Sequence, residues 1–188
     1  MTGFYVAAGA TGLLAAWVVY TYNVLVHLRS KVEEGFSGID VQLRRRHDLV
    51  PNLVEVVRGY AEHEQRALLA AVQARQEAVA ATGPADVDAA EQRLAKGMSV
   101  VLALAERYPA LRASSQFGQL VYELTEIEDE IQAARRLYNM NAAFYNTRAQ
   151  QFPVFLVADR MTPREFPFLH FDLIERDTAN LIAGGYAA

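Results

Sequence analysis

The sequence contains no cysteine, so it has no disulfide bridges, no thiolate metal ligands, no cysteine nucleophile and no lipidated N-terminal cysteine. It also has no glycine-rich phosphate loop and no nucleophile elbow. Its net charge of −4 gives no general indication of nucleic-acid binding, and we expect none. The chain has 188 residues, of which 52% are hydrophobic and 21% charged, enough for one domain of ordinary size with attachments.

A run almost free of charge extends from Gly3 to Leu28. About 26 helical residues span roughly 39 Å, which crosses a hydrocarbon core of about 30 Å with some tilt. A cleaved secretory signal is the alternative, but it needs a basic start, and Met1 and Thr2 offer only the α-amino group. We therefore expect a retained single-pass anchor in the lipid bilayer.

The positive charges follow this run, at Arg29, Lys31 and the block Arg44–Arg46. The positive-inside rule then predicts an outside N-terminus and a cytoplasmic main body. Aromatic residues that suit the inner interface are Trp17, Tyr20 and Tyr22. A ridge of small residues, Ala8, Gly12 and Ala16, could bring spans close together, although small residues are common in membrane helices anyway.

Beyond the span, apolar residues recur at intervals of three and four, which is typical of a helix-bundle or coiled-coil seam. They are Val32, Phe36, Ile39, Leu43, Val50, Leu53, Val57, Tyr60, Ala67 and Ala71. Arg46 and Glu64 interrupt this seam. We expect the membrane helix to continue into it, with Pro51 causing a kink or a stop and restart capped by Asp48, and then to reach about Ala80.

Two further helices are predicted. One begins after the break at 82–86, with Asp86 or Asp88 as cap, and ends near Tyr108. Its buried side is predicted to comprise Leu94, Met98, Val101 or Leu102, and Ala105. The other runs from about Ser115 to Gln151, and its seam is Phe117, Leu120, Leu124, Ile127, Ile131, Ala134, Tyr138, Asn141 and Tyr145.

These elements predict an all-α fold, in which an N-terminal transmembrane helix continues into a long antiparallel bundle of four helices, counting the Pro51 kink as a boundary. We divide the chain into an anchor (1–28), a bundle domain (29–153) and a tail (154–188). The tail holds Phe166, Phe168 and Phe171. It could be a strand on another chain or a membrane-surface segment, but we expect a lid packed on the bundle.

The histidines do not form a recognisable metal site. A di-iron bundle needs Glu three residues before His, and the residues at that position are Val24, Arg44, Tyr60 and Pro167. His63-Glu64 resembles the start of HExxH, but Ala67 stands where the second histidine belongs. We therefore expect no metal, no cofactor and no catalytic residues.

The acidic run from Glu123 to Glu130 could bind a cation, but its pattern is more typical of a solvated helix face. Glu128 borders the seam and is the best candidate for a buried partner of an arginine. The candidate arginines are Arg44, Arg45, Arg46 and Arg58. If Arg46 sets helix register, Arg46→Leu should leave the bundle folded and alter its assembly.

Several motifs in one order and spacing resemble the LemA family of bacterial membrane-anchored proteins. They are Tyr22-Asn23-x-Leu25-Val26, the stretch Val32–Val54, Gly59-Tyr60-Ala61-x-His63-Glu64, Ala105-Glu106-x-Tyr108-Pro109-x-Leu111, Ala134-Arg135-x-x-Tyr138-Asn139, Tyr145-Asn146 and Phe152-Pro153. The resemblance implies a plasma-membrane (inner-membrane) anchor with a cytoplasmic helical bundle, and no established enzymatic activity. It makes Arg135 and His63, with the polar seam residues, candidate interaction residues.

We therefore hold two functional hypotheses. The first is a non-enzymatic scaffold that forms homo-oligomers and organises the bacterial membrane or envelope. The second is an adaptor that binds another membrane protein, for instance a protease, through a bundle face or the tail. An enzyme with unrecognised chemistry is a third and weaker reading, because no nucleophile, base and orienting group come together in the sequence.

Overall fold

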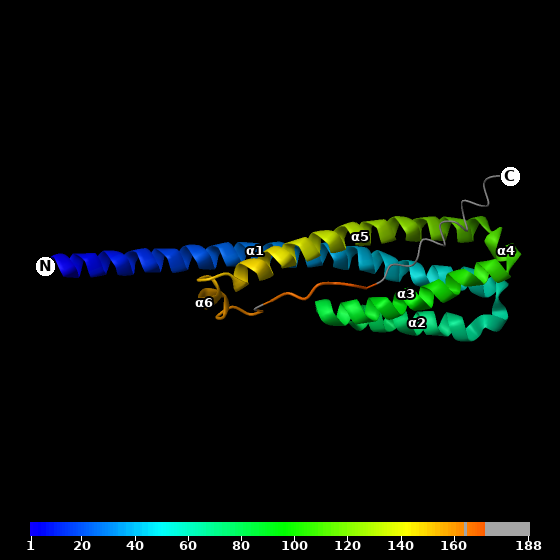
Figure 1. Cartoon of the computed structure of the whole chain (residues 1–188). Coiled ribbons are helices and arrows are strands. Elements are labelled where there is room, and N and C mark those ends of the chain that lie inside the picture. Colours follow the sequence, from blue (N-terminus) through cyan, green and yellow to red (C-terminus); the bar gives the residue numbers. More distant parts are fainter. Residues whose placement is uncertain (164, 172–188) are drawn as a thin grey trace. The chain divides into compact units, whose positions relative to one another are not determined.

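The computed structural model describes residues 1–163 and 165–171, and all regular structure within these ranges is helical (Figure 1). The helices are α1 (Thr2–Tyr60), α2 (Gln65–Ala80), α3 (Pro84–Arg107), α4 (Pro109–Arg112), α5 (Ser115–Gln150) and α6 (Phe155–Ala158), with a 3-10 turn at Glu62–Glu64. The predicted all-α fold with a long N-terminal helix is confirmed.

The contacts divide the chain into two compact units. We call residues 1–37 with 136–168 the anchor unit, and residues 38–135 with the segment that starts at 169 the bundle unit. Because α1 and α5 are long, each supplies one part of its length to each unit.

The first helix ends at a place that the sequence does not mark. α1 continues through Pro51 and stops at Tyr60, so the prediction of one helix up to Ala80 is wrong. Ala61 leaves the helical region, with φ −127° and ψ 52°, and the 3-10 turn then leads into α2. Tyr60, predicted as a seam residue, is 44% exposed. The fourth helix therefore arises from a reversal at 61–64 and not from Pro51.

The structure compensates for the backbone bond that Pro51 removes. Proline has no N–H, so the carbonyl of His47, four residues earlier, loses its helical donor. The guanidinium of Arg75 in α2 donates from Nε to this carbonyl oxygen at 2.5 Å. α1 therefore stays helical at Pro51 with an arginine in place of the missing donor, and Asp48 caps no new helix.

The third helix starts at Pro84, after Gly83 with φ 80°, a conformation that favours glycine. Neither Asp86 nor Asp88 caps it, contrary to the prediction. Asp88 instead accepts hydrogen bonds from the backbone N–H groups of His170 and Phe171. The predicted buried side of this helix is confirmed, since Leu94, Met98, Val101, Leu102 and Ala105 are all buried.

Within the anchor unit, α1 and α5 pack antiparallel and approach closely at Gly35. A Cβ at Gly35 would lie 3.2 Å from the Cα of Tyr138. Asn141 Nδ2 donates to the carbonyl of Lys31 at 3.0 Å, and the ring centroids of Phe36 and Tyr138 are 5.8 Å apart. Asn141 is thus a polar seam residue because it bonds the backbone of the facing helix.

The described part of the tail packs on its own chain. In the anchor unit, Phe166 stacks edge-on against Tyr145 at 5.0 Å between ring centroids, and Asn146 exchanges two hydrogen bonds with its backbone. In the bundle unit, Phe171 is fully buried, and the Arg135 guanidinium lies 5.4 Å from its ring centroid. Residues 164 and 172–188, which belong to the predicted tail, lie outside the described residues.

Candidate functional site

A buried cluster of charged side chains joins three helices of the bundle unit. Arg46 of α1 donates from Nε to Glu128 Oε1 of α5 at 2.7 Å, and from Nη2 to the other oxygen of the same carboxylate. Its Nη1 donates to Glu91 Oε2 of α3 at 2.8 Å. The remaining oxygen of Glu91 lies 2.6 Å from His47 Nε2. One guanidinium thus bridges two carboxylates from two other helices.

The cluster is almost closed to water. Arg46 is 0% exposed and Glu91 is 1% exposed, while Glu128 and His47 are each 7% exposed. Burial alone would lower the pKa of Arg46, but the negative charges of Glu128 and Glu91 and their hydrogen bonds outweigh burial, so its pKa is raised. Arg46 therefore stays charged at any physiological pH.

The buried polar atoms of the cluster all have hydrogen-bond partners. Among the described residues, no buried side-chain nitrogen or oxygen lacks a hydrogen-bond partner. No group of His, Asp and Glu within the same residues could hold a metal ion. Both carboxylates already accept from Arg46, so neither is placed as a general base beside a nucleophile. The arrangement fixes helix positions, which is the structural role that a buried ion network can perform.

The structure separates the three arginines of the Arg44–Arg46 block. Arg44 pairs with Asp40 on the same helix, and Arg45 pairs with Glu130 at 2.6 Å on the surface of the bundle unit. Only Arg46 is buried, and it is the arginine that meets Glu128. Arg58 is exposed in the last turn of α1.

Two other candidates lie at the reversal between α1 and α2. His63 is exposed in the 3-10 turn. Glu64 pairs with Arg107 at 3.0 Å and accepts a long hydrogen bond, 3.5 Å, from Tyr108. Glu64 therefore interrupts the seam because the helix has already ended, and it ties the turn to the end of α3. Arg135 donates to the carbonyl of Phe171 and so holds the described tail.

The sequence did not lead us to predict that Glu91 and His47 belong to this cluster. A signal was present for Glu91, since it lies three residues before Leu94 and seven before Met98, on the predicted buried side of its helix. His47 directly follows Arg46, but nothing local shows that it turns inward to an acidic side chain.

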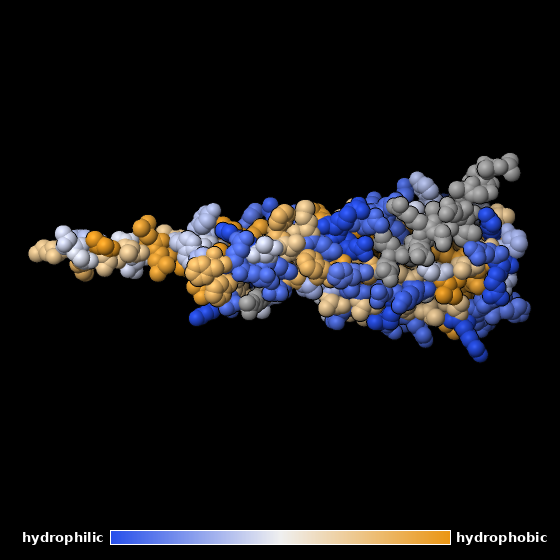
Figure 2. Space-filling view, viewed as in Figure 1, coloured by the Kyte–Doolittle hydropathy of each residue, from blue (hydrophilic) through white to orange (hydrophobic). Residues whose placement is uncertain are grey.

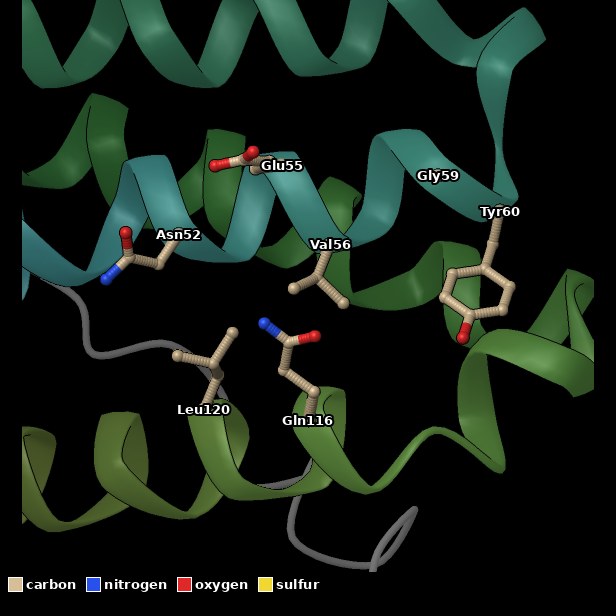
Figure 3. Close-up of a pocket in the computed structure, with 7 residues that line it drawn as sticks. All are labelled: Asn52, Glu55, Val56, Gly59, Tyr60, Gln116 and Leu120. Atoms are coloured by element: carbon tan, nitrogen blue, oxygen red, sulfur yellow. The ribbon is translucent and has the colours of Figure 1, made fainter.

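An open hollow of about 410 Å³ lies between the end of α1 and the start of α5 (Figure 3). It is lined by Asn52, Glu55, Val56, Gly59, Tyr60, Gln116 and Leu120. In Figure 3, the Gln116 and Leu120 side chains point toward the face of α1 that carries Val56. The lining contains one carboxylate, that of Glu55, and one hydroxyl, that of Tyr60, and no histidine, lysine or serine.

The anchor unit carries exposed apolar surfaces. The N-terminal part of α1 is the one described helix segment long and apolar enough to cross a membrane by length and composition, and its apolar window is not buried. Figure 2 shows the apolar colouring along this part and over the α6 end of the same unit. The predicted membrane residues Ala8, Gly12, Ala16, Tyr20 and Tyr22 are exposed, and Trp17 is partly exposed.

A second apolar surface follows α5 within the anchor unit. Leu137, Met140 and Phe144 are 50%, 49% and 60% exposed. Their spacing of three and four places them on one helix face. Tyr138, on the opposite side, is buried against α1, and burial raises its pKa to about 12, so its hydroxyl stays protonated and donates to the Pro167 carbonyl at 2.8 Å.

Comparison with protein families identifies the family of this chain. The model of the LemA family matches residues 35–180, which is most of the chain. The chain belongs to the LemA family. It is similar to Protein LemA of Metamycoplasma hominis, with 26% identity over 85% of this chain and 74% of that protein.

Two further relatives are magnetosome proteins. The chain is 22% identical to magnetosome protein MamQ of Magnetospirillum gryphiswaldense over 70% of this chain and 58% of that protein. It is 23% identical to magnetosome protein MamQ 2 of Paramagnetospirillum magneticum over 73% of this chain and 60% of that protein. The chain therefore spans less than two thirds of either magnetosome protein.

Proposed function

We propose that the protein is a non-enzymatic, membrane-anchored scaffold that associates with further copies of itself and organises the bacterial membrane. The observation that carries this proposal is the exposed face Leu137, Met140 and Phe144, which lies in the same unit as the uncovered apolar span. The likeness to magnetosome proteins supports a role at membranes without assigning one.

The membrane favours pairing of this face with its own copy. All copies that insert with the same topology hold α5 at the same height and in the same direction relative to the bilayer. The face that one copy presents is then presented by its neighbour at the same level, which is the condition for a self-complementary interface. Large apolar side chains at a spacing of three and four are the kind that interlock between parallel helices.

The test is the mass of the full-length protein in mild detergent or nanodiscs. Wild type is expected to form a discrete oligomer, and Met140→Glu with Phe144→Glu is expected to lower the mass to that of one chain. The matched control is Val100→Glu with Tyr122→Glu, which places two charges at exposed apolar sites of the bundle unit and should leave the mass unchanged. A wild-type protein that is monomeric at membrane-like density would overturn the scaffold.

The adaptor is the second candidate. Within the Phe-rich part of the tail, Phe166 and Phe171 are buried on the chain itself, while Phe168 is 43% exposed. The surface that we assign to an adaptor is the Leu137, Met140 and Phe144 face of α5. If the protein is an adaptor, the wild type should be monomeric and should co-purify with one other membrane protein. The Met140→Glu, Phe144→Glu variant should not co-purify with that protein.

A further inference from the structure

Part of the apolar span is covered by the protein itself. Thr21 and Leu25 are 3% and 0% exposed, although both belong to the run predicted to lie in the membrane. Between Thr2 and Tyr20, by contrast, every residue is exposed except Trp17, which is partly exposed. The span therefore has an uncovered part, followed by a part with a protein-covered side.

The register of the anchor unit identifies the cover. Gly35 faces Tyr138, and Lys31 faces Asn141, so the two helices pass each other antiparallel. Continued along both helices, this register brings the buried Ala149 and the corner after it level with Leu25 and Thr21. Arg29 also donates to the Thr162 carbonyl at 2.5 Å, which ties the segment after α6 to the same stretch of α1.

The uncovered part has the length of a bilayer core. Residues 2–20 form about 19 helical residues and measure about 28 Å, against about 30 Å for the hydrocarbon layer. The hydrocarbon boundary then falls near Tyr20 and Tyr22, which are aromatic residues suited to an interface. The corner between α5 and α6 begins to cover α1 at this same level.

The side chains of this corner suit the boundary between headgroups and acyl chains. Phe152 is 82% exposed and Leu156 is 56% exposed, and the Phe152 and Phe155 ring centroids are 6.3 Å apart. Arg148 and Arg160 flank them, with Asp159 as an acidic neighbour. Exposed aromatic and aliphatic side chains next to arginines are the composition of segments that lie in a membrane interface.

We propose that the α5–α6 corner, residues 151–156, is a second membrane contact that inserts Phe152, Phe155 and Leu156 into the lipid interface beside the span. The proposal rests on the membrane anchor in the proposed function. It makes the protein bind lipid through two elements, one that crosses the bilayer and one that rests on its inner edge. Continuity with the span selects lipid as the occupant over a second protein copy.

The absence of cysteine makes a direct test possible in the full-length chain. Leu156→Cys carries an environment-sensitive nitrobenzoxadiazole label, and the protein is reconstituted into vesicles of phosphatidylethanolamine and phosphatidylglycerol, with or without lipids that carry a quenching spin label either at a shallow depth or deep in the acyl chain. Leu13→Cys reports the span itself. Ser37→Cys, exposed on the same unit and about 25 Å beyond Tyr20 at about 1.5 Å per residue, reports water.

The label at 156 is expected to emit at shorter wavelength than the label at 37 and to be quenched by the shallow spin label, while the label at 37 is not quenched. Quenching at 13 without quenching at 156 overturns the second contact and leaves the anchor intact. A short-wavelength but unquenched label at 156 also overturns it, because the occupant is then protein. An unquenched label at 13 removes the anchor, and with it both proposals.

Discussion

Arg46 is a charged residue at a position where the seam pattern requires an apolar one, and its neighbours explain why it is tolerated. Removing a guanidinium from water is costly, and its attraction to carboxylates repays that cost only when the geometry is good and the other polar atoms are satisfied. Here two glutamates from two helices accept its N–H groups, one of them through both oxygens. In return, Arg46 compensates the buried negative charges of Glu91 and Glu128.

Arg46→Leu is therefore expected to destabilise the protein by about 3–5 kcal/mol, because it removes the buried cation that two buried carboxylates contact. This replaces the sequence-based expectation of an unchanged fold with altered assembly, since Arg46 is fully buried inside one unit. Thermal unfolding of the detergent-solubilised protein, followed by circular dichroism, measures the effect.

The control for this prediction is Arg45→Leu, which removes a half-exposed pair with Glu130 and should cost no more than about 1 kcal/mol. Arg46→Leu combined with Glu128→Leu should lower the stability by less than the sum of the two single changes, because the second change removes a buried carboxylate that no longer contacts Arg46. Equal melting of the Arg45→Leu and Arg46→Leu variants would contradict the assigned role of the cluster.

The sequence could predict half of this cluster. Glu128 stands out because it is an acidic residue next to a clear seam, and several arginines lie on the facing helix. Arg46 stands out among them because it occupies a seam position where the pattern requires an apolar residue, but the seam does not show which acidic residues it meets. Glu91 lies within the buried pattern of α3, but a helix pattern shows which side is buried and not what it meets.

At the scale of the helices, local sequence signals predict a break at Pro51 and none at 61–64. The structure shows the opposite at both positions. Proline is the strongest helix breaker, yet α1 passes through it. The segment Ala61-Glu62-His63-Glu64 contains no glycine or proline, yet the helix ends there. Both outcomes depend on contacts distant in sequence, which are Arg75 at the His47 carbonyl and Arg107 at Glu64.

The coupling between Pro51 and Arg75 can be measured as a double-mutant cycle. Arg75→Ala should cost about 1 kcal/mol or more in the wild-type chain, because the partly buried carbonyl of His47 then loses its donor. In the Pro51→Ala background the new backbone N–H supplies that bond, so the same Arg75→Ala change should cost clearly less.

The measurement is again the melting of the four proteins under one detergent condition. Arg66→Ala, on the exposed side of the same helix, serves as the background-independent control. An Arg75→Ala effect of equal size with proline and with alanine at position 51 would show that the arginine does not replace the missing donor.

At the scale of the whole molecule, the fold class and the long apolar N-terminal helix could be predicted because they depend on long patterns. A run of about 26 residues almost free of charge and the seams of three helices remain recognisable despite local errors such as the missed turn. The orientation in the membrane depends on fewer residues, namely Arg29, Lys31 and the Arg44–Arg46 block, and it stays a prediction.

This orientation can be tested with single cysteines in spheroplasts. Thr2→Cys is expected to react with a membrane-impermeant maleimide in intact cells, whereas Val100→Cys, which is 53% exposed, should react only after lysis. The positive charges that follow the span are the physical reason for this direction. Labelling of Val100→Cys before lysis, with Thr2→Cys protected, would reverse the assignment.

The contact between Arg75 and the carbonyl freed by Pro51 has a consequence for how such sequences can change over time. Position 51 can lose its proline at little cost, because any other residue restores the backbone donor. Position 75 can lose its arginine cheaply only after that step has occurred. Lineages that lose both residues should therefore replace Pro51 first. The intermediate with Arg75 and no proline at 51 keeps its stability, whereas the intermediate with Pro51 and no arginine at 75 is less stable.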